Sequence, residues 1–187
     1  WKHVVVTSVT RDDLPDGGAS QFVQVVKEIR KRAGSTSVEL LVPDFGGNWE
    51  ALRKVVAARP HVLAHNVETV PRLYPEFRNK AVYMRSLELL ARAHAYAPRM
   101  ELKSGLMVGL GETRDEVASV MEDLFCAGVR SVTLGQYLPP SRSHPPAREY
   151  LPVEAFSSFA DTARKMGFTR VVAGPLVRSS YKAGTEM

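Results

Sequence analysis

The stretch that decides the fold is Lys103-Ser-Gly-Leu-Met-Val-Gly-Leu-Gly-Glu-Thr113. Residues 102–108 are short and apolar and contain a glycine, which is typical of a strand whose backbone another group approaches. Two more glycines follow, and Thr113 with Glu116 then has the spacing of a capping box at a helix N-terminus. A strand, a glycine turn and a helix in series predict the carboxyl end of a strand, where α/β sheets and barrels bind ligands.

The two turn glycines, Gly109 and Gly111, have two interpretations. They can leave room for a ligand whose carboxylate or ribose touches backbone amides. They can equally supply the positive φ angles of a plain turn that binds nothing. Lys103 at the start of the strand and Glu112 at its exit favour a site.

The rest of the chain repeats the order of strand and then helix. We predict strands over residues 3–8, 38–42, 61–65, 102–108, 132–134 and 169–173. We predict helices over residues 19–33, 49–58, 83–96, 113–128 and 152–166. Strands that alternate with helices predict a parallel α/β sheet, because each parallel connection needs a crossover. No G-x-G-x-x-G follows the first strand, so we prefer a partial (β/α) barrel over a dinucleotide fold.

Length and composition narrow the class of protein. The 187 residues suit one domain and fall short of the roughly 250 residues of a complete eight-fold barrel. No apolar run approaches the roughly 20 residues of a membrane span. The net charge of +5 is scattered and no aromatic stacking platform accompanies it, so we expect no nucleic-acid partner.

The single cysteine, Cys126, excludes an internal disulfide and an all-cysteine metal site. We expect it to be a buried, inert thiol on a helix. The chain begins at Trp1 without an initiator methionine or a basic leader, and we expect it to be cut from something longer.

Polar residues gather at the same end of successive predicted strands, with Lys103 and Glu112 placed around the fourth strand. They are Asp12, Asp13 and Asp16, then Asp44, then His65, Asn66 and Glu68, then Lys103 and Glu112, and finally Gln136 and Tyr137. In a barrel these side chains face one mouth, which predicts a pocket for a polar ligand of mixed charge.

Several of these residues also have a purely structural interpretation. The three aspartates can shape a turn and cap a helix, and His65 can be a satisfied core histidine. Asn66 and Glu68 alternate with Val67, so both can point into the barrel. Lys103 is an anion clamp, a Schiff-base nucleophile or an edge residue.

Six motifs together resemble those of lipoyl synthases, in order and with matching spacing. They are TSVTRDDLPDGG (7–18), ELLVPDF (39–45), AHNVETVPRL (64–73), KSGLMVGLGET (103–113), TLGQYLPPS (133–141) and GPLVRSSYKA (174–183). The resemblance implies a radical S-adenosylmethionine enzyme on a partial (β/α)6 barrel, here missing its first strand and N-terminal extension. The barrel would span residues 1–173, and residues 174–187 would form a tail that returns to the active site.

The resemblance also implies an activity, which is the insertion of two sulfur atoms at carbons 6 and 8 of a protein-bound octanoyl chain. The cofactors would be S-adenosylmethionine and two [4Fe-4S] clusters. The partners would be an octanoylated lipoyl-carrier protein (glycine cleavage H protein or the lipoyl domain of a dehydrogenase) and an iron-sulfur carrier protein. The protein would be cytoplasmic, or located in the mitochondrial matrix of a eukaryote.

The same resemblance implies roles for single residues. Gly17 and Gly18 would meet the amino group of the methionine moiety, Asn66 and Glu68 would lie against the cofactor, and Lys103 and Ser104 would be near its carboxylate. The nucleoside would be supported by Gly105, Gly109, Gly111 and Glu112, and its adenosyl side would be closed by Gln136 and Tyr137. Arg178 would offset the charge of a serine alkoxide. Either Ser179 or Ser180 would ligate the auxiliary cluster, and the sequence does not decide between them.

The chain departs from the family in one respect. Neither C-x3-C-x2-C nor C-x4-C-x5-C, the family's cluster motifs, occurs in it. We therefore expect this chain to hold neither cluster, to be inactive alone and to be the C-terminal portion of a longer enzyme. A Schiff-base barrel aldolase that uses Lys103, and a non-catalytic module that binds S-adenosylmethionine or a carrier protein, are the alternatives.

Overall fold

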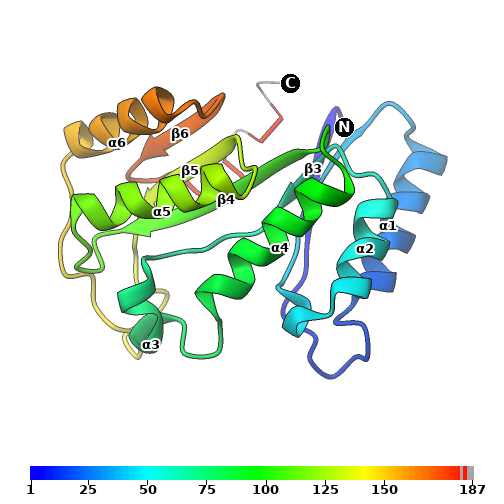
Figure 1. The fold of residues 1–187 in the computed structure, drawn as a ribbon, viewed down its shortest axis with the longest axis horizontal. Coiled ribbons are helices and arrows are strands. Elements are labelled where there is room, and N and C mark those ends of the chain that lie inside the picture. The colour runs from blue at the N-terminus through cyan, green and yellow to red at the C-terminus, as the bar shows by residue number, and fades with distance from the viewer. Residues whose placement is uncertain (182, 185–187) are drawn as a thin grey trace.

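A computed structural model describes residues 1–181, 183 and 184 (Figure 1). Lys182 and residues 185–187, which belong to the predicted tail, lie outside the described residues. Six parallel strands form one sheet in the order β1-β2-β3-β4-β5-β6. The strands are β1 (His3–Thr7), β2 (Ser37–Leu41), β3 (Val62–Ala64), β4 (Glu101–Val108), β5 (Ser131–Gln136) and β6 (Arg170–Gly174).

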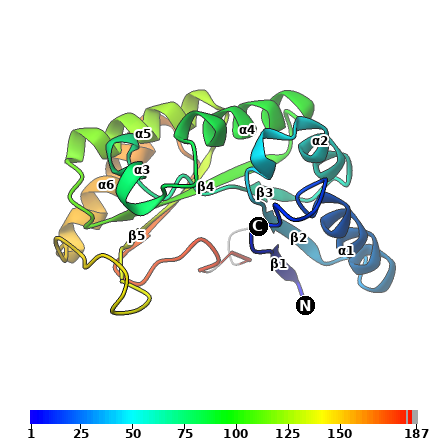
Figure 2. The ribbon, with the colours of Figure 1, turned by 90° about the horizontal axis from the view of Figure 1, so that it is seen from below.

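Helices connect successive strands and cover one side of the sheet. They are α1 (Ala19–Arg32), α2 (Trp49–Ala57), α3 (Tyr74–Phe77), α4 (Tyr83–Tyr96), α5 (Arg114–Cys126) and α6 (Val153–Met166), with short 3-10 turns at Phe45–Gly47 and Pro71–Leu73. Figure 2 shows the sheet curving with the helices on its outer side and the tail on its inner side. Among the described residues β1 and β6 are outer strands that do not pair with each other, so the barrel is partial, as the sequence predicted.

The helix boundaries follow from local chemistry. Thr113 and Glu116 form the predicted capping box at the start of α5, in which each side chain bonds the backbone amide of the other residue. Gly128 (φ 94°) and Gly167 (φ 103°) end α5 and α6 in the left-handed region, which favours glycine.

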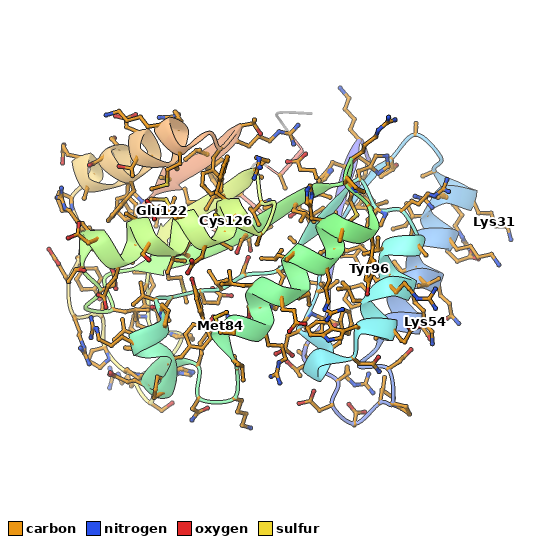
Figure 3. The ribbon with its side chains drawn as sticks, viewed as in Figure 1. Lys31, Lys54, Met84, Tyr96, Glu122 and Cys126 are labelled. Carbon is orange, nitrogen blue, oxygen red and sulfur yellow. The ribbon has the colours of Figure 1, made fainter. Side chains whose placement is uncertain are left out.

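Cys126 is exposed on α5, so the prediction of a buried thiol is wrong (Figure 3). The buried stripe of α5 consists of Val117, Val120, Met121 and Leu124, which recur at the helical period. Cys126 follows Leu124 by two residues, and this offset turns its side chain away from the stripe. Apolar sequence neighbours therefore did not indicate burial.

A buried ion pair crosses the inner side of the sheet. Lys103 Nζ lies 2.9 Å from Glu39 Oε1, and both side chains are buried. Their strands, β4 and β2, both pair with β3 and not with each other, so the two side chains reach toward one another across β3. Lys103 is therefore not an edge residue. The pair is part of the polar interior of the partial barrel.

Replacing Lys103 with Met should destabilise the fold strongly, because the buried Glu39 carboxyl would lose its lysine partner and keep only His3 Nε2, 3.5 Å from its Oε2. The expected loss in the free energy of unfolding is about 3–5 kcal/mol. Urea denaturation measures it. The double variant Glu39→Met with Lys103→Met should recover much of the loss, and Arg53→Ala, which breaks an exposed pair with Glu50, should change the stability little. A Lys103→Met variant as stable as the wild type would show that Glu39 does not need this partner.

Candidate functional site

Two cavities lie at the carboxyl ends of the strands. The larger cavity, of about 940 Å³, lies against β1, β2 and β3, and the smaller one, of about 190 Å³, lies between β4, β5 and the tail. Asn66 and Glu68 line both. Arg78 and Lys80 add positive charge to the larger cavity, and Arg178 adds it to the smaller one. The predicted mixed-charge pocket is therefore present.

The loop after β3 aims Asn66 and Glu68 into these cavities. Val67 between them is fully buried in the core, as the alternation predicted. The Glu68 backbone pairs with β4, because its N–H donates to the Gly105 carbonyl (2.9 Å) and its carbonyl accepts from the Met107 N–H (2.7 Å). Glu68 has a φ of 67°, which is uncommon for a residue other than glycine and is typical of functional sites.

Tyr74, Ser104 and Arg78 support this loop by hydrogen bonds to its backbone. The Tyr74 hydroxyl donates to the Val67 carbonyl (2.7 Å), and the Val67 N–H donates to Ser104 Oγ (3.3 Å). Arg78 Nη1 donates to the Asn66 carbonyl (2.9 Å). Ser104, predicted to lie near the cofactor, is fully buried and acts on this loop instead of lining either cavity.

The Asn66 side chain connects Glu68 to the tail. Asn66 Nδ2 donates to Glu68 Oε1 (3.1 Å) and to Ser179 Oγ (3.4 Å). Its Oδ1 is buried and accepts no hydrogen bond from any described residue. Because buried polar atoms are nearly always hydrogen-bonded, this oxygen indicates a ligand that donates to it.

Glu68 is partly buried, and this burial raises its pKa because the charged form loses solvation. Arg78, Asn66 and Arg178 act in the opposite direction and lower the pKa. The balance leaves a carboxyl group between two arginines that is harder to ionise than an exposed glutamate.

Gly105 lets the side chains of Asn66 and Thr133 lie close to the β4 backbone. A Cβ at this position would lie 2.8 Å from Thr133 Oγ1 and 3.0 Å from Asn66 Oδ1. Gly105 is thus the one glycine of the 103–113 motif that lines a cavity. Its predicted place beside a ligand remains a prediction with this observation in its favour.

Gly109 (φ 96°) and Gly111 (φ 101°) have the positive φ angles of the plain-turn interpretation, and their place near a nucleoside stays a prediction. The Glu112 carboxylate accepts from the backbone amides of Gly109 (2.6 Å) and Leu110 (2.9 Å), so the chain's own side chain occupies the anion position. A side chain at Gly109 would collide with Gln136 and the Glu149 carbonyl. At Gly111 a Cβ would lie 2.7 Å from Arg148 Cδ.

Segment 145–151 therefore fills the room above these glycines. Gln136 fixes it, since its Nε2 donates to the Glu149 carbonyl (2.9 Å) and its Oε1 accepts from the Leu151 N–H (3.0 Å). The Tyr137 hydroxyl donates to the Pro145 carbonyl (2.9 Å). None of the residues 109, 111, 112, 136 and 137 lines either cavity.

Gly17 and Gly18, which were predicted to meet the amino group of the methionine moiety, lie outside both cavities. Gly17 packs against the Phe45 ring and Gly18 lies at the start of α1, and neither lines either cavity. Asp16 accepts from the amides of Gly18 (3.0 Å) and Ser20 (2.8 Å), which confirms the capping interpretation for that aspartate. Asp12 lines the larger cavity.

His65 is a satisfied core histidine, as the sequence allowed. Its Nδ1 donates to the Val42 carbonyl (2.9 Å), and its Nε2, in the neutral ring, accepts from the Ser86 hydroxyl (2.9 Å). Burial lowers its pKa, so the ring stays neutral. Among the described residues no group of three His, Cys, Asp or Glu side chains could hold a metal ion.

The two serines of the tail differ in their surroundings. Ser179 is half-buried and lines the smaller cavity beside Asn66, whereas Ser180 is exposed. Arg178 also lines this cavity and donates from Nη1 to the Val177 carbonyl (2.6 Å).

Sequence reasoning missed Arg78 and Thr133. Arg78 lies in an irregular segment after α3 and stacks over the Tyr74 ring at 5.6 Å from its centroid. Such a segment has no hydrophobic periodicity, so the sequence alone did not show that the Arg78 guanidinium would line the larger cavity. Thr133 lies inside an apolar strand, where threonine is an ordinary β-former.

Comparison with known proteins now identifies the family. The sequence profile of the radical SAM superfamily matches residues 1–124. The chain belongs to the radical SAM superfamily. It is 52% identical over 182 residues to the lipoyl synthase of Alkaliphilus metalliredigens and 56% identical over 182 residues to that of Caldanaerobacter subterraneus. It is also 54% identical over 181 residues to that of Citrifermentans bemidjiense.

These alignments cover 97% of this chain and 63%, 64% and 62% of those relatives, so the chain spans less than two thirds of their length. The resemblance to lipoyl synthases that the motifs indicated is thus confirmed. The structure of a methylornithine synthase is similar with a TM-score of 0.66 and 14% identity, over all of this chain and 63% of that one. That likeness concerns the fold alone and supports the partial barrel. No helix in the described part of the chain is long and apolar enough to span a membrane.

The residues present fit S-adenosylmethionine and do not fit an iron-sulfur cluster. The unpartnered Asn66 oxygen and the charged Glu68 and Arg78 suit a ligand that carries donors and both signs of charge. A cluster needs several thiolates, and the one cysteine of the sequence, Cys126, is exposed on the outer face of α5.

Replacing Glu68 with Gln should change how stability depends on pH. Because the folded-state pKa of Glu68 is raised, the wild-type protein should lose stability as pH rises from the ordinary glutamate pKa of 4.5 through that raised value. The variant should lack this part of the loss and should be the more stable protein at pH 8. Chemical denaturation at pH 4.5 and pH 8 measures both, and equal pH dependence in the two proteins would refute the raised pKa.

Replacing Glu112 with Ala should weaken the glycine turn, because two backbone amides would lose a charged acceptor. We expect a loss of about 1.5–3 kcal/mol in the free energy of unfolding. Glu122→Ala on the exposed face of α5 is the control and should be nearly neutral (Figure 3). If the two variants are equally stable, Glu112 does not hold the turn.

Proposed function

We propose that this chain is part of a lipoyl synthase, which inserts two sulfur atoms at carbons 6 and 8 of an octanoyl chain on a carrier protein. One observation carries the proposal. The loop after β3 and the returning tail, two motifs more than 100 residues apart in the sequence, meet at one cavity through Asn66 and Ser179 (3.4 Å; separation of 113 residues). The identity to curated lipoyl synthases over 97% of the chain supports the same assignment.

In this proposal the larger cavity receives S-adenosylmethionine. When bound, S-adenosylmethionine would supply hydrogen-abstracting radical chemistry after one-electron reduction by a cluster of the whole protein. The Asn66 oxygen would accept from a ligand N–H or O–H, and Glu68 would face positive charge on the ligand. Arg78, which is fixed by Tyr74 and the Asn66 carbonyl, would balance a ligand carboxylate.

The two [4Fe-4S] clusters belong to the proposal only for the whole protein. This chain offers no set of thiolates for either, so we assign no step to a cluster here. Of the two candidate serines, Ser179 is the one that lines a cavity, which favours it over Ser180 as a ligand supplied by the tail. The octanoylated carrier protein and an iron-sulfur carrier protein are proposed partners on the same basis.

The geometry disfavours a Schiff-base aldolase. Lys103 is held by Glu39 and lines neither cavity, and a paired ammonium group is not a nucleophile. A module that binds S-adenosylmethionine without catalysis keeps the cavities and lacks the sulfur chemistry. An assay of sulfur transfer distinguishes such a module from the enzyme.

In the natural full-length protein, Asn66→Ala and Glu68→Ala should each weaken S-adenosylmethionine binding about 10- to 100-fold, which is about 1.4–2.8 kcal/mol. Each variant would remove a polar group that lines the cavity proposed for the ligand. Isothermal calorimetry measures the affinity. Lys31→Ala, exposed at the end of α1, is the control and should bind as the wild type does (Figure 3).

Mass spectrometry of an octanoylated carrier protein then tests the reaction. With reductant and cofactor the carrier should gain two sulfur atoms. Cofactor binding without sulfur gain would favour the non-catalytic module, and an affinity that neither substitution changes would place the cofactor elsewhere.

A further inference from the structure

The tail crosses the inner side of the sheet immediately above β5 (Figure 2). It leaves β6 after Gly174 in a turn closed by the Val177 N–H, which donates to the Gly174 carbonyl (3.1 Å). Val177 is buried, although Leu176 before it and Arg178 after it are exposed. The tail is thus anchored at one buried residue, Val177, which lines the smaller cavity together with the next two residues, Arg178 and Ser179.

Gly135 of β5 lies directly beneath that anchor. A Cβ at this position would collide with the Val177 carbonyl oxygen and would lie 3.1 Å from Arg178 Nη1. The Val177 oxygen is a backbone atom, so the tail itself would have to move to relieve the collision. Gly135 is not among the glycines with positive φ, so any residue could adopt its backbone conformation. The structure needs glycine here for space alone.

The same contact sets the direction of the next side chains. The Val177 carbonyl that rests on Gly135 also accepts from Arg178 Nη1 (2.6 Å). The guanidinium is thereby held over β5, where its charge acts on Glu68. Ser179 follows and reaches Asn66. The distance between the tail backbone and β5 therefore determines where the Arg178 and Ser179 side chains lie.

We propose that Gly135 is a positioning residue, whose missing side chain lets the tail approach β5 and brings Arg178 and Ser179 to the Asn66–Glu68 site. The importance of that placement for sulfur insertion rests on the proposed function. The placement itself does not, so it can be tested separately.

The neighbouring strand offers a matched control. Gly174 is the cross-strand partner of Gly135 in the β5–β6 pairing and also has no positive φ. A Cβ at Gly174 would lie 3.4 Å from Val177 Cγ2, an ordinary contact with a side chain. Gly174→Ala therefore makes the same chemical change beside the same anchor without forcing the tail to move.

The test compares Gly135→Ala and Gly174→Ala in the natural full-length protein. Trypsin cleavage after Arg178 under native conditions reports whether the tail is held. We expect Gly135→Ala to accelerate this cleavage at least 10-fold and Gly174→Ala to leave it near the wild-type rate. Equal cleavage rates in all three proteins would overturn the proposal.

Titration of Glu68, followed by carboxyl ¹³C NMR, is the second readout, which a merely structural role of Gly135 would not move. Arg178 lowers the pKa of Glu68, so displacing the tail should raise that pKa in Gly135→Ala and not in Gly174→Ala. An unchanged Glu68 titration in Gly135→Ala would count against the proposal. Failure of the sulfur-insertion assay with both readouts as expected would reject the proposed function and leave the placement intact.

If Gly135→Ala does not fold, removal of residues 175–187 provides the remaining comparison. In the shortened protein Gly135→Ala should unfold at the same denaturant concentration as its shortened parent, because the colliding carbonyl is gone. A shortened variant that still fails to fold would show that Gly135 serves the sheet and not the tail.

Discussion

Two backbone hydrogen bonds between Glu68 and β4 organise the site. β3 is only three residues long, and these bonds continue its pairing with β4 past a bend at Asn66 and Val67. The bend requires a positive φ at Glu68, which costs on the order of 1–3 kcal/mol for a residue other than glycine. In return, Val67 enters the core while the polar side chains on both sides of it face the cavities. Ser104, Tyr74 and Arg78 all act on this bend, so the site is the end of a strand that several elements stabilise.

The inner side of the sheet is polar. Because the barrel is partial, polar side chains and the tail of the chain itself occupy the space on this side. Glu39 and Lys103 pair across β3 at one level, and the tail crosses β5 at another. Buried charges are tolerated only when they are paired, and irregular backbone is tolerated only when its polar groups are bonded. Glu39 and Lys103 meet the first condition. The tail meets part of the second, since the Val177 N–H bonds the Gly174 carbonyl and the Tyr181 N–H bonds the Arg178 carbonyl, while Asn66 bonds the Ser179 side chain.

The sequence predicted the fold well because its elements are short, periodic and separated by glycine, proline or aspartate. The strands, the capping box at Thr113 and the inward direction of Asn66 and Glu68 all follow from local rules. Local rules could not predict which distant residues would contact Lys103 or the turn glycines. Lys103 could be a clamp, a nucleophile or an edge residue until Glu39 lay beside it, and the turn glycines could hold a ligand until segment 145–151 was seen to fill their space. Both depend on contacts between residues far apart in the chain.

The Glu112 carboxylate already accepts hydrogen bonds from the Gly109 and Leu110 amides of the glycine turn, so these amides are not available to charged groups of a ligand. The polar groups that line the two cavities include the Asn66 oxygen and Glu68, which attract a donor or a positive charge, and Arg78, Lys80 and Arg178, which attract a carboxylate. S-adenosylmethionine carries an ammonium, a sulfonium and one carboxylate, so it presents both kinds of group. A cation bound beside Glu68 favours its ionised form, so on the proposed function the partly buried carboxyl, hard to ionise in the free protein, becomes charged when the ligand that needs it arrives.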